Sequence, residues 1–451
     1  MLRPGELVVD NFAGGGGAST GIELGLNRHV DIAINHDPVA IDMHKVNHPE
    51  AKHYCESVWN VNPIVACMGL PVGFAWFSPD CKHFTKARGC TPVDKNIRGL
   101  AWVAVRWAML VPVRVFALEN VEEFLTWGPV VEEPPGKYMP CKKRKGETYD
   151  GFIKALTTGI TPRHPTWKEM CQVLDIEFDI SAKLKLFKGL GYQVDYKVLS
   201  ACDYGAPTTR KRFFLMARND NEPIQWPQKT HGPAGSGLEP YRTAADIIDW
   251  QVPVRSIFNR KKPLAENTMK RIAKGVEKFV LGSASPFIVR IGQTGFGGDR
   301  LSWSINQPLT TVTSKAEHLL IKPYFKKQCD MDDHVMNEGE VRAFMMKYYG
   351  PNIGLSCEEP LHTITTKDRF ALVTVQGVGY EVIDIGMRML EPHELFAAQG
   401  FPEDYVISHD SSGKKLSKAS QVARCGNAVC PPIAQALVEA NMKTNQVAKA
   451  A

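Results

Sequence analysis

Four consecutive glycines, at residues 14–17, constrain the fold of this chain more than any other feature of its sequence. They follow a short apolar segment, residues 6–10, and precede a helix-like segment that ends at Leu26. Glycine adopts positive φ without strain and lets the backbone approach a bound molecule closely. A strand, a glycine turn and a helix in this order predict the first unit of an α/β sheet, with a ligand at the turn. The spacing is not G-x-G-x-x-G, which disfavours a pyrophosphate grip and favours an adenosyl amino acid; a purely structural turn is the alternative.

Strand-like and helix-like segments alternate after the glycine turn. Such alternation is typical of proteins with a parallel sheet covered by helices. The predicted strands are residues 30–34, 72–77, 113–118 and 213–217, and the predicted helices are residues 38–46, 100–110, 391–399 and 431–442. The predicted fold class is α/β, with a doubly wound, mostly parallel sheet and a smaller β-rich domain.

Composition and charge narrow the class of protein. The chain has 451 residues, of which 44% are hydrophobic and 23% charged, enough for two or three globular domains. The absence of a run of about 18 apolar residues predicts no transmembrane helix, and the first residues lack the apolar segment of a signal peptide. Eleven cysteines without a CxxC pair predict a reducing cytoplasm. The net charge of +6 is compatible with a polyanionic partner.

Residues 142–145, Lys-Lys-Arg-Lys, form a local cluster of positive charge after the proline-rich stretch at 133–136. The prolines predict that this cluster lies on a loop. The loop is either a solvated surface segment or a contact to phosphate groups, and both interpretations stay open at this level.

A second region, residues 219–385, is richer in proline, glycine and threonine, and its apolar runs are short and strand-like. It contains an internal repeat, because residues 308–315 (PLTTVTSK) match residues 360–367 (PLHTITTK). Apolar runs precede and follow each copy. Two copies of one β unit is the economical interpretation, and chance similarity between threonine-rich strands is the alternative.

Polar residues follow the second and third strand-like segments. Asn35 and Asp37 come where a ribose hydroxyl is usually bound in folds of this class. Glu56 follows a third short element, where an adenine amino group could be held. Each of these residues can equally be an ordinary polar residue of the surface.

Cys81 lies on the loop that follows the apolar strand at residues 72–77. A loop beyond the carboxyl end of a parallel strand faces the ligand crevice. Lys82 and His83, next to the cysteine, favour its thiolate, which is the nucleophilic form. Most of the eleven cysteines are expected to be packing residues, but this position predicts a nucleophile.

Polar and charged residues also lie near two other strand ends. Glu119 and Asn120 follow the strand at residues 113–118, so the carboxyl group is predicted to point into the same crevice. Arg210 and Arg212 alternate just before the last predicted strand, and alternate residues of an extended chain share one face.

Six segments, taken in order, resemble the motifs of the cytosine-5 DNA methyltransferases. The match covers roughly residues 6–218 and 386–441, and six motifs in order are far more specific than any one of them. The segments are residues 10–17 (DxFAGxGG), 78–84 (the Pro-Cys-Gln loop), 119–121 (Glu-Asn-Val, unchanged), 208–212 (Gln-x-Arg-x-Arg), and 399–402 and 426–429 (two closing motifs).

Four residues depart from the family pattern. Asp80 and Lys82 replace the residues on either side of the nucleophile. Asn35 stands where the family usually has a ribose-binding glutamate, and Thr208 replaces the first glutamine of Gln-x-Arg-x-Arg. The nucleophile, the acid and both arginines are retained, so the resemblance implies an active enzyme.

The resemblance implies a Rossmann-like methyltransferase domain at residues 1–218, with an insertion at about 128–170. It implies a target-recognition domain at residues 219–385 and a C-terminal part, residues 386–451, that rejoins the first domain. It further implies S-adenosyl-L-methionine as cofactor, no metal, double-stranded DNA as partner, and a monomeric enzyme of the cytoplasm.

Roles of individual residues are also implied. Cys81 attacks C6 of a flipped cytosine, Glu119 acts at N3, and Arg210 holds the base at O2 with help from Arg212. The implied cofactor contacts are Phe12, Gly14, Gly15, Gly17, Asn35, Asp37, Glu56, Asn427 and Ala428, and the implied substrate contacts are Asn120, Thr208, Lys315, Lys367 and Arg369.

Three alternatives stay open. The first is transfer of another group to C5 from a modified cofactor, for which Asn35 and Lys82 are the motivation. The second is a sequence-specific DNA-binding regulator without catalysis, and the third is an RNA methyltransferase with a similar motif set. The large repeat-containing region before residue 386 favours a DNA-reading domain.

Overall fold

The computed structural model describes residues 1–80, 99–132, 138–258, 260–280, 285–291, 302–327, 341–347, 354–356, 370–376 and 380–443. The chain forms two compact units. Unit 1 comprises Met1–Tyr241, Thr310–Ser314 and Phe396–Ala451, and unit 2 comprises Arg242–Leu309 and Lys315–Leu395. Within the described residues, no helix combines the length and the hydropathy needed to cross a membrane.

Unit 1 is built on a seven-stranded sheet of order β3-β2-β1-β4-β5-β9-β8. Six of its strands run in one direction, five of them as parallel neighbours, and β9 runs antiparallel to both of its neighbours, β5 and β8. This arrangement confirms the predicted α/β class with a mostly parallel sheet. The strands are β1 (Leu7–Asn11), β2 (Ile32–Ile34), β3 (Lys52–Tyr54), β4 (Val72–Phe77), β5 (Val113–Asn120), β8 (Gln193–Ser200) and β9 (Lys211–Arg218).

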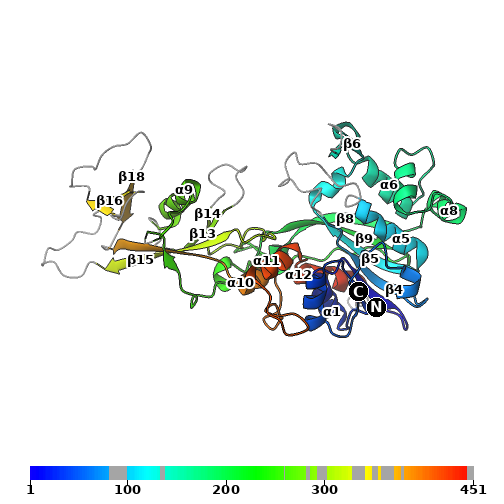
Figure 1. Cartoon of the computed structure of the whole chain (residues 1–451), viewed down its shortest axis with the longest axis horizontal. Helices are drawn as coiled ribbons and strands as arrows, with labels where there is room; N and C mark the ends of the chain where they lie inside the picture. The colour runs from blue at the N-terminus through cyan, green and yellow to red at the C-terminus, as the bar shows by residue number, and fades with distance from the viewer. Residues whose placement is uncertain are drawn as a thin grey trace. The chain divides into compact units, whose positions relative to one another are not determined.

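Helices cover both faces of this sheet (Figure 1). One apolar layer joins Val8 to Ile22 of α1 and Leu437 of α12, and the other joins Val9 to Trp102 of α5. Val8 and Val9 belong to opposite layers because successive side chains of a strand point to opposite faces. The helices of unit 1 are α1 (Gly17–Leu26), α2 (Pro38–Asn47), α3 (Pro63–Ala66), α5 (Trp102–Leu110), α6 (Glu147–Leu156), α7 (Trp167–Val173), α8 (Ile180–Lys188), α11 (Lys418–Asn427) and α12 (Pro431–Met442).

Helix α12 packs closely against α1, although more than 400 residues of sequence separate them. A Cβ on Gly21 would lie 2.6 Å from Ala434 Cβ, and a Cβ on Gly25 would lie 2.8 Å from Val438 Cγ1. Glycine at both positions therefore permits the close approach. Both helices belong to the same compact unit of the chain.

The segment between β5 and β8 holds the basic cluster. It contains the 3₁₀ turns η3 (Glu122–Thr126) and η4 (Lys142–Arg144), the hairpin β6 (Val130–Glu132) and β7 (Tyr138–Pro140), and helices α6, α7 and α8. The side chains of residues 142–145 are exposed, and Arg144 forms an ion pair with Glu147.

Unit 2 is largely antiparallel. A five-stranded sheet of order β12-β19-β15-β13-β14 packs against α9 (Glu266–Gly275), and a three-stranded sheet has the order β17-β16-β18. The strands are β12 (Arg255–Ser256), β13 (Phe287–Arg290), β14 (Ser302–Ser304), β15 (His318–Lys327), β16 (Val341–Lys347), β17 (Gly354–Ser356), β18 (Phe370–Gln376) and β19 (Tyr380–Met389). Helix α10 (Pro392–Ala398) and the minor elements η2 (Gly99–Ala101), η5 (Ala201–Tyr204), η6 (Ala244–Asp246), η7 (Val276–Val280), β10 (His231–Gly232) and β11 (Glu239–Pro240) complete the described structure.

The apolar runs around each copy of the repeat are strands that pair with one another. Phe287 of β13 lies opposite Ile321 of β15, and Phe344 of β16 lies opposite Val373 of β18, both pairs antiparallel. Within the first copy, Thr310–Ser314 belongs to unit 1. The second copy, residues 360–367, lies outside the described residues.

Candidate active site

The carboxyl ends of β1, β2, β4 and β5 lie at one edge of the sheet because these strands are parallel. Phe12 follows β1, Asn35 follows β2, and Glu119 lies at the end of β5. Strand β9 runs the other way, with Phe213 opposite Asn120, so its first residues reach the same edge. Sheet topology thus brings together residues that are up to 200 positions apart.

Glu119 and Arg212 form an ion pair at this edge. Arg212 Nε lies 3.2 Å from Glu119 Oε1, and the two side chains are only 16% and 11% exposed. A guanidinium beside a mostly buried carboxylate fixes the position of that carboxylate. Glu119 is therefore a preorganised acidic group at the carboxyl-end edge of the sheet.

Asn120 anchors the loop that leads to the cysteine. Its Nδ2 donates a hydrogen bond of 3.1 Å to the carbonyl of Pro79, and its Oδ1 accepts one of 2.9 Å from the Val121 amide. Pro79 comes two residues before Cys81, which lies outside the described residues together with Lys82 and His83. Asn120 thus ties the end of β5 to the backbone that carries the predicted nucleophile.

Arg210 holds two distant backbone segments together. Its Nη1 donates to the carbonyls of Val312 (3.2 Å) and Gly426 (3.1 Å), whereas its buried Nε has no hydrogen-bond partner within the described structure. Gly426 faces the backbone of Thr313, which leaves no room for a Cβ. Thr208 is fully buried and its Oγ1 has no partner there either.

The glycine turn meets the chain's own atoms on most sides. A Cβ on Gly15 would lie 3.2 Å from Arg424 Cβ. A Cβ on Gly17 would overlap the Val429 carbonyl oxygen and lie 3.2 Å from Ala428 Cβ. Gly14 differs, since the nearest atom to its ideal Cβ position is the Phe12 carbonyl oxygen at 3.7 Å. Phe12 itself has a φ of 66°, which is rare for a residue with a side chain. The open side of the turn is therefore at Phe12 and Gly14.

The polar residues after β2 and β3 differ in how fully they are engaged. Asp37 caps α2 by accepting from the Val39 amide, and it forms an ion pair of 2.8 Å with Arg424. Asn35 is half-buried and uses Oδ1 to accept from the Asp37 amide. Glu56 is exposed. The side-chain nitrogen of Asn35 and the carboxylate of Glu56 are thus the groups best placed to meet a ligand at this end.

The predicted contacts near the chain's C-terminal end lie at the end of α11. Asn427 is its last residue and is exposed, whereas Ala428 is buried beside Gly17. Lys315 of unit 2 is exposed. Lys367 and Arg369 lie outside the described residues.

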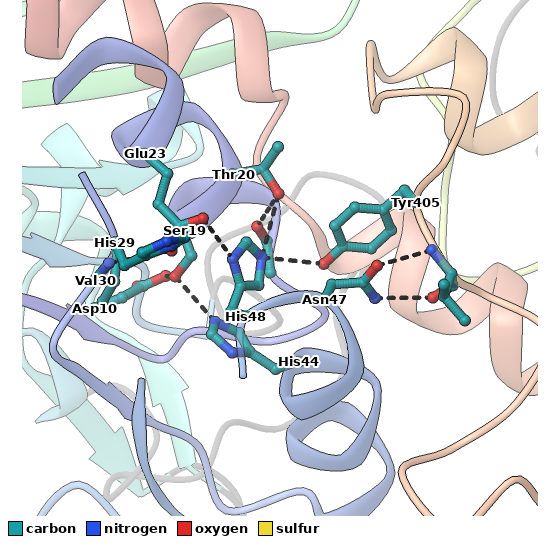
Figure 2. A network of polar contacts seen from close by, with 12 residues as sticks. Asp10, Ser19, Thr20, Glu23, His29, Val30, His44, Asn47, His48 and Tyr405 are labelled. Carbon is teal, nitrogen blue, oxygen red and sulfur yellow. Dashed lines mark hydrogen bonds and ion pairs between the residues drawn. The ribbon is translucent and has the colours of Figure 1, made fainter. Parts of the chain in front are cut away.

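A buried polar network supports the glycine turn from behind (Figure 2). Tyr405 Oη donates a 2.6 Å hydrogen bond to the Gly15 carbonyl and lies 3.4 Å from His48 Nε2. His48 Nδ1 in turn lies 2.9 Å from Glu23 Oε2. A Cβ on Gly16 would overlap Tyr405 Oη and lie 2.8 Å from His48 Nε2, so this position requires glycine.

A second branch of the network begins at β1. Ser19 Oγ donates to Asp10 Oδ2 at 2.7 Å and lies 2.9 Å from His44 Nε2. His44 Nδ1 lies 2.8 Å from Nε2 of His53, which is half-buried. This row of side chains connects the fully buried Asp10 to the protein surface.

Burial shifts the titration of this network. It raises the pKa of the Asp10 carboxyl to about 7 from its ordinary 3.8, against the hydrogen bond from Ser19. Burial, together with the charges of His48 and His53, lowers the pKa of His44 well below its ordinary 6.5. His44 is therefore neutral near pH 7, and Asp10 exchanges its proton in that range.

Sequence reasoning missed this network. One signal was present, because His48 follows His44 by four residues, just past the end of the helix predicted at residues 38–46, and residues four apart on a helix share one face. Tyr405 gave no such signal, since it lies 390 residues after Gly15. Among the residues that the structure describes, no three His, Cys, Asp or Glu side chains are arranged to hold a metal ion.

Comparison with known proteins identifies the family. The model of the C-5 cytosine-specific DNA methylases matches residues 178–443, more than half of the chain. The chain belongs to this family. The family resemblance inferred from the six motifs is thereby confirmed.

Individual relatives are distant. The type II methyltransferase M1.HphI of Haemophilus parahaemolyticus is 23% identical over 442 residues, which cover 97% of this chain and 87% of that protein. DNA (cytosine-5)-methyltransferase 1A of Oryza sativa subsp. japonica is 24% identical over 475 residues, covering 95% of this chain and 28% of that protein. The solved structure of the Entamoeba histolytica methyltransferase EhMeth aligns with a TM-score of 0.47 at 13% identity, covering 97% of this chain and 98% of that one.

Proposed function

We propose that this chain is a DNA (cytosine-5-)-methyltransferase that transfers a methyl group from S-adenosyl-L-methionine to a cytosine flipped out of double-stranded DNA. The observation that carries the proposal is the convergence at one sheet edge of Glu119, its partner Arg212, and the Asn120 amide that holds Pro79. The reaction needs an acidic group, a cation that positions it and the start of the loop that carries the cysteine, all in one place.

The residues around the glycine turn fit an adenosyl amino acid. The open face at Phe12 and Gly14 admits a ligand against the backbone, and the half-buried Asn35 and the exposed Glu56 stand at the ends of the next two strands. Asn35 offers its amide nitrogen to a ribose oxygen, and Glu56 offers a carboxylate to an adenine amino group. S-adenosyl-L-methionine, when bound, supplies the electrophilic methyl group.

The chain's own residues activate the cytosine. The Cys81 thiolate adds to C6, which breaks aromaticity and makes C5 nucleophilic, while Glu119 stabilises the charge that develops at N3. Arg212 keeps Glu119 in place throughout. Arg210 holds Thr310–Ser314 beside Gly426, and its Nε, which has no hydrogen-bond partner in the described structure, is the atom proposed to reach O2 of the base. Loss of the C5 proton and of Cys81 then restores the base.

Recognition of the DNA sequence is assigned to the region of residues 219–385. Lys315, Lys367 and Arg369 are the proposed contacts, because lysine and arginine bind phosphates and the acceptor edge of guanine. The proposed working compartment is the cytoplasm.

Covalent trapping tests the proposal. DNA that contains 5-fluorocytosine should form a stable adduct with the wild-type chain, because the fluorine at C5 cannot leave as a proton. Cys81→Ala should abolish both the adduct and methyl transfer while DNA binding survives. The matched control is Cys141→Ala, since Cys141 is a free cysteine of the insertion. An adduct formed by Cys81→Ala would remove Cys81 from the mechanism.

The identity of the transferred group is tested at Asn35. Asn35→Glu should keep or improve the affinity for S-adenosyl-L-methionine, because a carboxylate accepts both ribose hydroxyls in charge-assisted bonds worth ~1.5–3 kcal/mol, or about tenfold or more. Loss of binding in calorimetry would support the alternative in which the natural cofactor carries an extra negative group. Mass spectrometry of nucleosides from DNA of the expressing cell would then identify the group on C5.

A further inference from the structure

Helix α8 of unit 1 presents apolar side chains to solvent. Ile180, Leu184 and Phe187 are 73%, 53% and 49% exposed, and Phe178, just before the helix, is 97% exposed. The spacing of four and then three residues places Ile180, Leu184 and Phe187 on one face of the helix. Isolated apolar residues on a surface are ordinary, but an aligned stripe of large ones marks an interaction site.

The opposite face of α8 is firmly held. Ala182 and Leu186 are buried in the apolar layer that contains Trp102 and Phe152. Lys185 Nζ donates to the Met109 carbonyl, so it attaches the helix to the end of α5. The exposed apolar stripe therefore lies on a helix whose other face is packed against the core, so its exposure does not arise from a poorly packed helix.

The helix ends carry opposite charges. Asp175, Glu177 and Asp179 precede the first helical turn and are exposed. Lys185 and Lys188 are exposed near the other end. A helix that is acidic at one end, apolar in the middle and basic at the other end is complementary to itself when two copies lie antiparallel.

We propose that α8 is the dimerisation helix of this protein and pairs antiparallel with α8 of a second copy. A two-fold axis between residues 183 and 184 places Ile180 opposite the partner's Phe187. The same axis places Asp179 opposite the partner's Lys188, and Glu177 lies one turn further along, within reach of that lysine. The interface contains each contact twice, as a two-fold symmetric dimer requires.

The available area sets the strength of the dimer. A large aromatic side chain buries about 150–250 Å², so the four exposed side chains offer on the order of 400 Å² per chain at their measured exposures. With the flanking charged residues, two copies bury about 1,000 Å², which is the lower limit for a specific interface. The dimer is therefore expected to dissociate in the micromolar range, and it replaces the monomer that the family resemblance implies.

Sedimentation velocity over a range of micromolar concentrations tests the pairing. The wild-type chain should shift from 50.1 kDa towards twice that mass as its concentration rises. Leu184→Asp should remain monomeric at every concentration. Val65→Asp is the matched control, because Val65 is a 69% exposed apolar residue on α3, outside the proposed interface. A wild-type chain that stays monomeric throughout, or a Leu184→Asp chain that still dimerises, would overturn the proposal.

Charge reversal tests the antiparallel geometry without relying on loss of function. Glu177→Lys and Lys188→Glu should each weaken self-association by about tenfold, because each places like charges opposite one another at least twice. A mixture of the two variants should form a mixed dimer that is more stable than either variant's own dimer. Three of its four opposed charge pairs are attractive, against two of four in the Glu177→Lys dimer and none in the Lys188→Glu dimer. If α8 instead binds a different kind of partner, mixing the two variants should not restore association. Failure of the mixture to associate would refute the antiparallel pairing.

Discussion

Gly16 is a position of the glycine turn that has no room for a side chain, and the effect of adding one can be worked out from the structure. Its φ of 90° is left-handed, and an added Cβ would overlap Tyr405 Oη. Left-handed backbone costs a non-glycine residue ~1–2 kcal/mol, and overpacking adds ~1–3 kcal/mol. Gly16→Ala is therefore expected to lower the free energy of unfolding by about 2–5 kcal/mol and to weaken binding of S-adenosyl-L-methionine.

A second substitution separates the two contributions. Tyr405→Phe removes Oη and with it the hydrogen bond to the Gly15 carbonyl, at a cost of ~0.5–1.5 kcal/mol. In the double variant the overlap with Oη is gone, so the double variant should be more stable than the sum of the single effects predicts, by about 1–2 kcal/mol. Backbone strain at residue 16 should remain.

Gly14→Ala is the matched control. Its φ of 54° is also left-handed, but its nearest neighbour lies 3.7 Å away, so only backbone strain applies. Combined with Tyr405→Phe, it should be additive within about 0.5 kcal/mol. Urea unfolding followed by tryptophan fluorescence measures stability, and calorimetry measures cofactor affinity. Additive effects of Gly16→Ala and Tyr405→Phe would refute the claim that the tyrosine hydroxyl occupies the space beside Gly16.

Three further predictions concern other buried contacts. Because the folded pKa of Asp10, about 7, lies above its unfolded value of 3.8, its contribution to stability is present at low pH and is lost as pH rises from about 4 to 7. Asp10→Asn should abolish this pH-dependent loss of stability, which amounts to about 4 kcal/mol between pH 4 and pH 7. Urea unfolding at several pH values measures it. A pH profile unchanged by the substitution would contradict a buried, titrating carboxyl group at Asp10. Arg388 and Glu394 of unit 2 form a buried bidentate ion pair with two N–O distances of 2.7 Å. Arg388→Met should lower the free energy of unfolding of unit 2 by about 3–5 kcal/mol, as measured by chemical unfolding. A loss below about 1 kcal/mol would mean that the pair is solvated. Asn120→Ala should slow methyl transfer by about fivefold with little change in DNA affinity, because one hydrogen bond to the cysteine loop is worth ~1 kcal/mol. An unchanged rate in single-turnover assays would remove Asn120 from loop positioning.

The central strands could be predicted because fully buried strands read as continuous apolar runs. Strand β4 spans Val72–Phe77, as its sequence indicates, and all six of its residues are buried. Strand β8 was missed, since five of its eight residues are exposed and its pattern resembles a surface loop. Helices α6 to α8 were missed as well, because they lie at residues 147–188, between the motifs at 119–121 and 208–212, and none of the motifs predicts the structure of that segment.

The candidate site divides in the same way. Glu119 and Asn120 were recognisable because a strand end fixes where they point. The structural roles of Asp37 and Arg210 were not recognisable from the sequence, because each side chain binds a partner that is distant in sequence. Asp37 is paired with Arg424, 387 residues away, and Arg210 binds the Gly426 carbonyl, 216 residues away. Side chains that connect such distant segments have no local pattern that a single sequence could reveal.

The dependence of the glycine turn on Tyr405 has a consequence for synthesis of the protein on the ribosome. The turn is translated first, but the hydroxyl that binds its carbonyl follows 390 residues later. At ~5–20 residues per second, the nascent turn waits on the order of 20–80 s for that partner. The proposed cofactor site is therefore completed only near the end of translation, so a chain truncated before residue 405 should lack affinity for S-adenosyl-L-methionine even though every residue of the glycine turn is present.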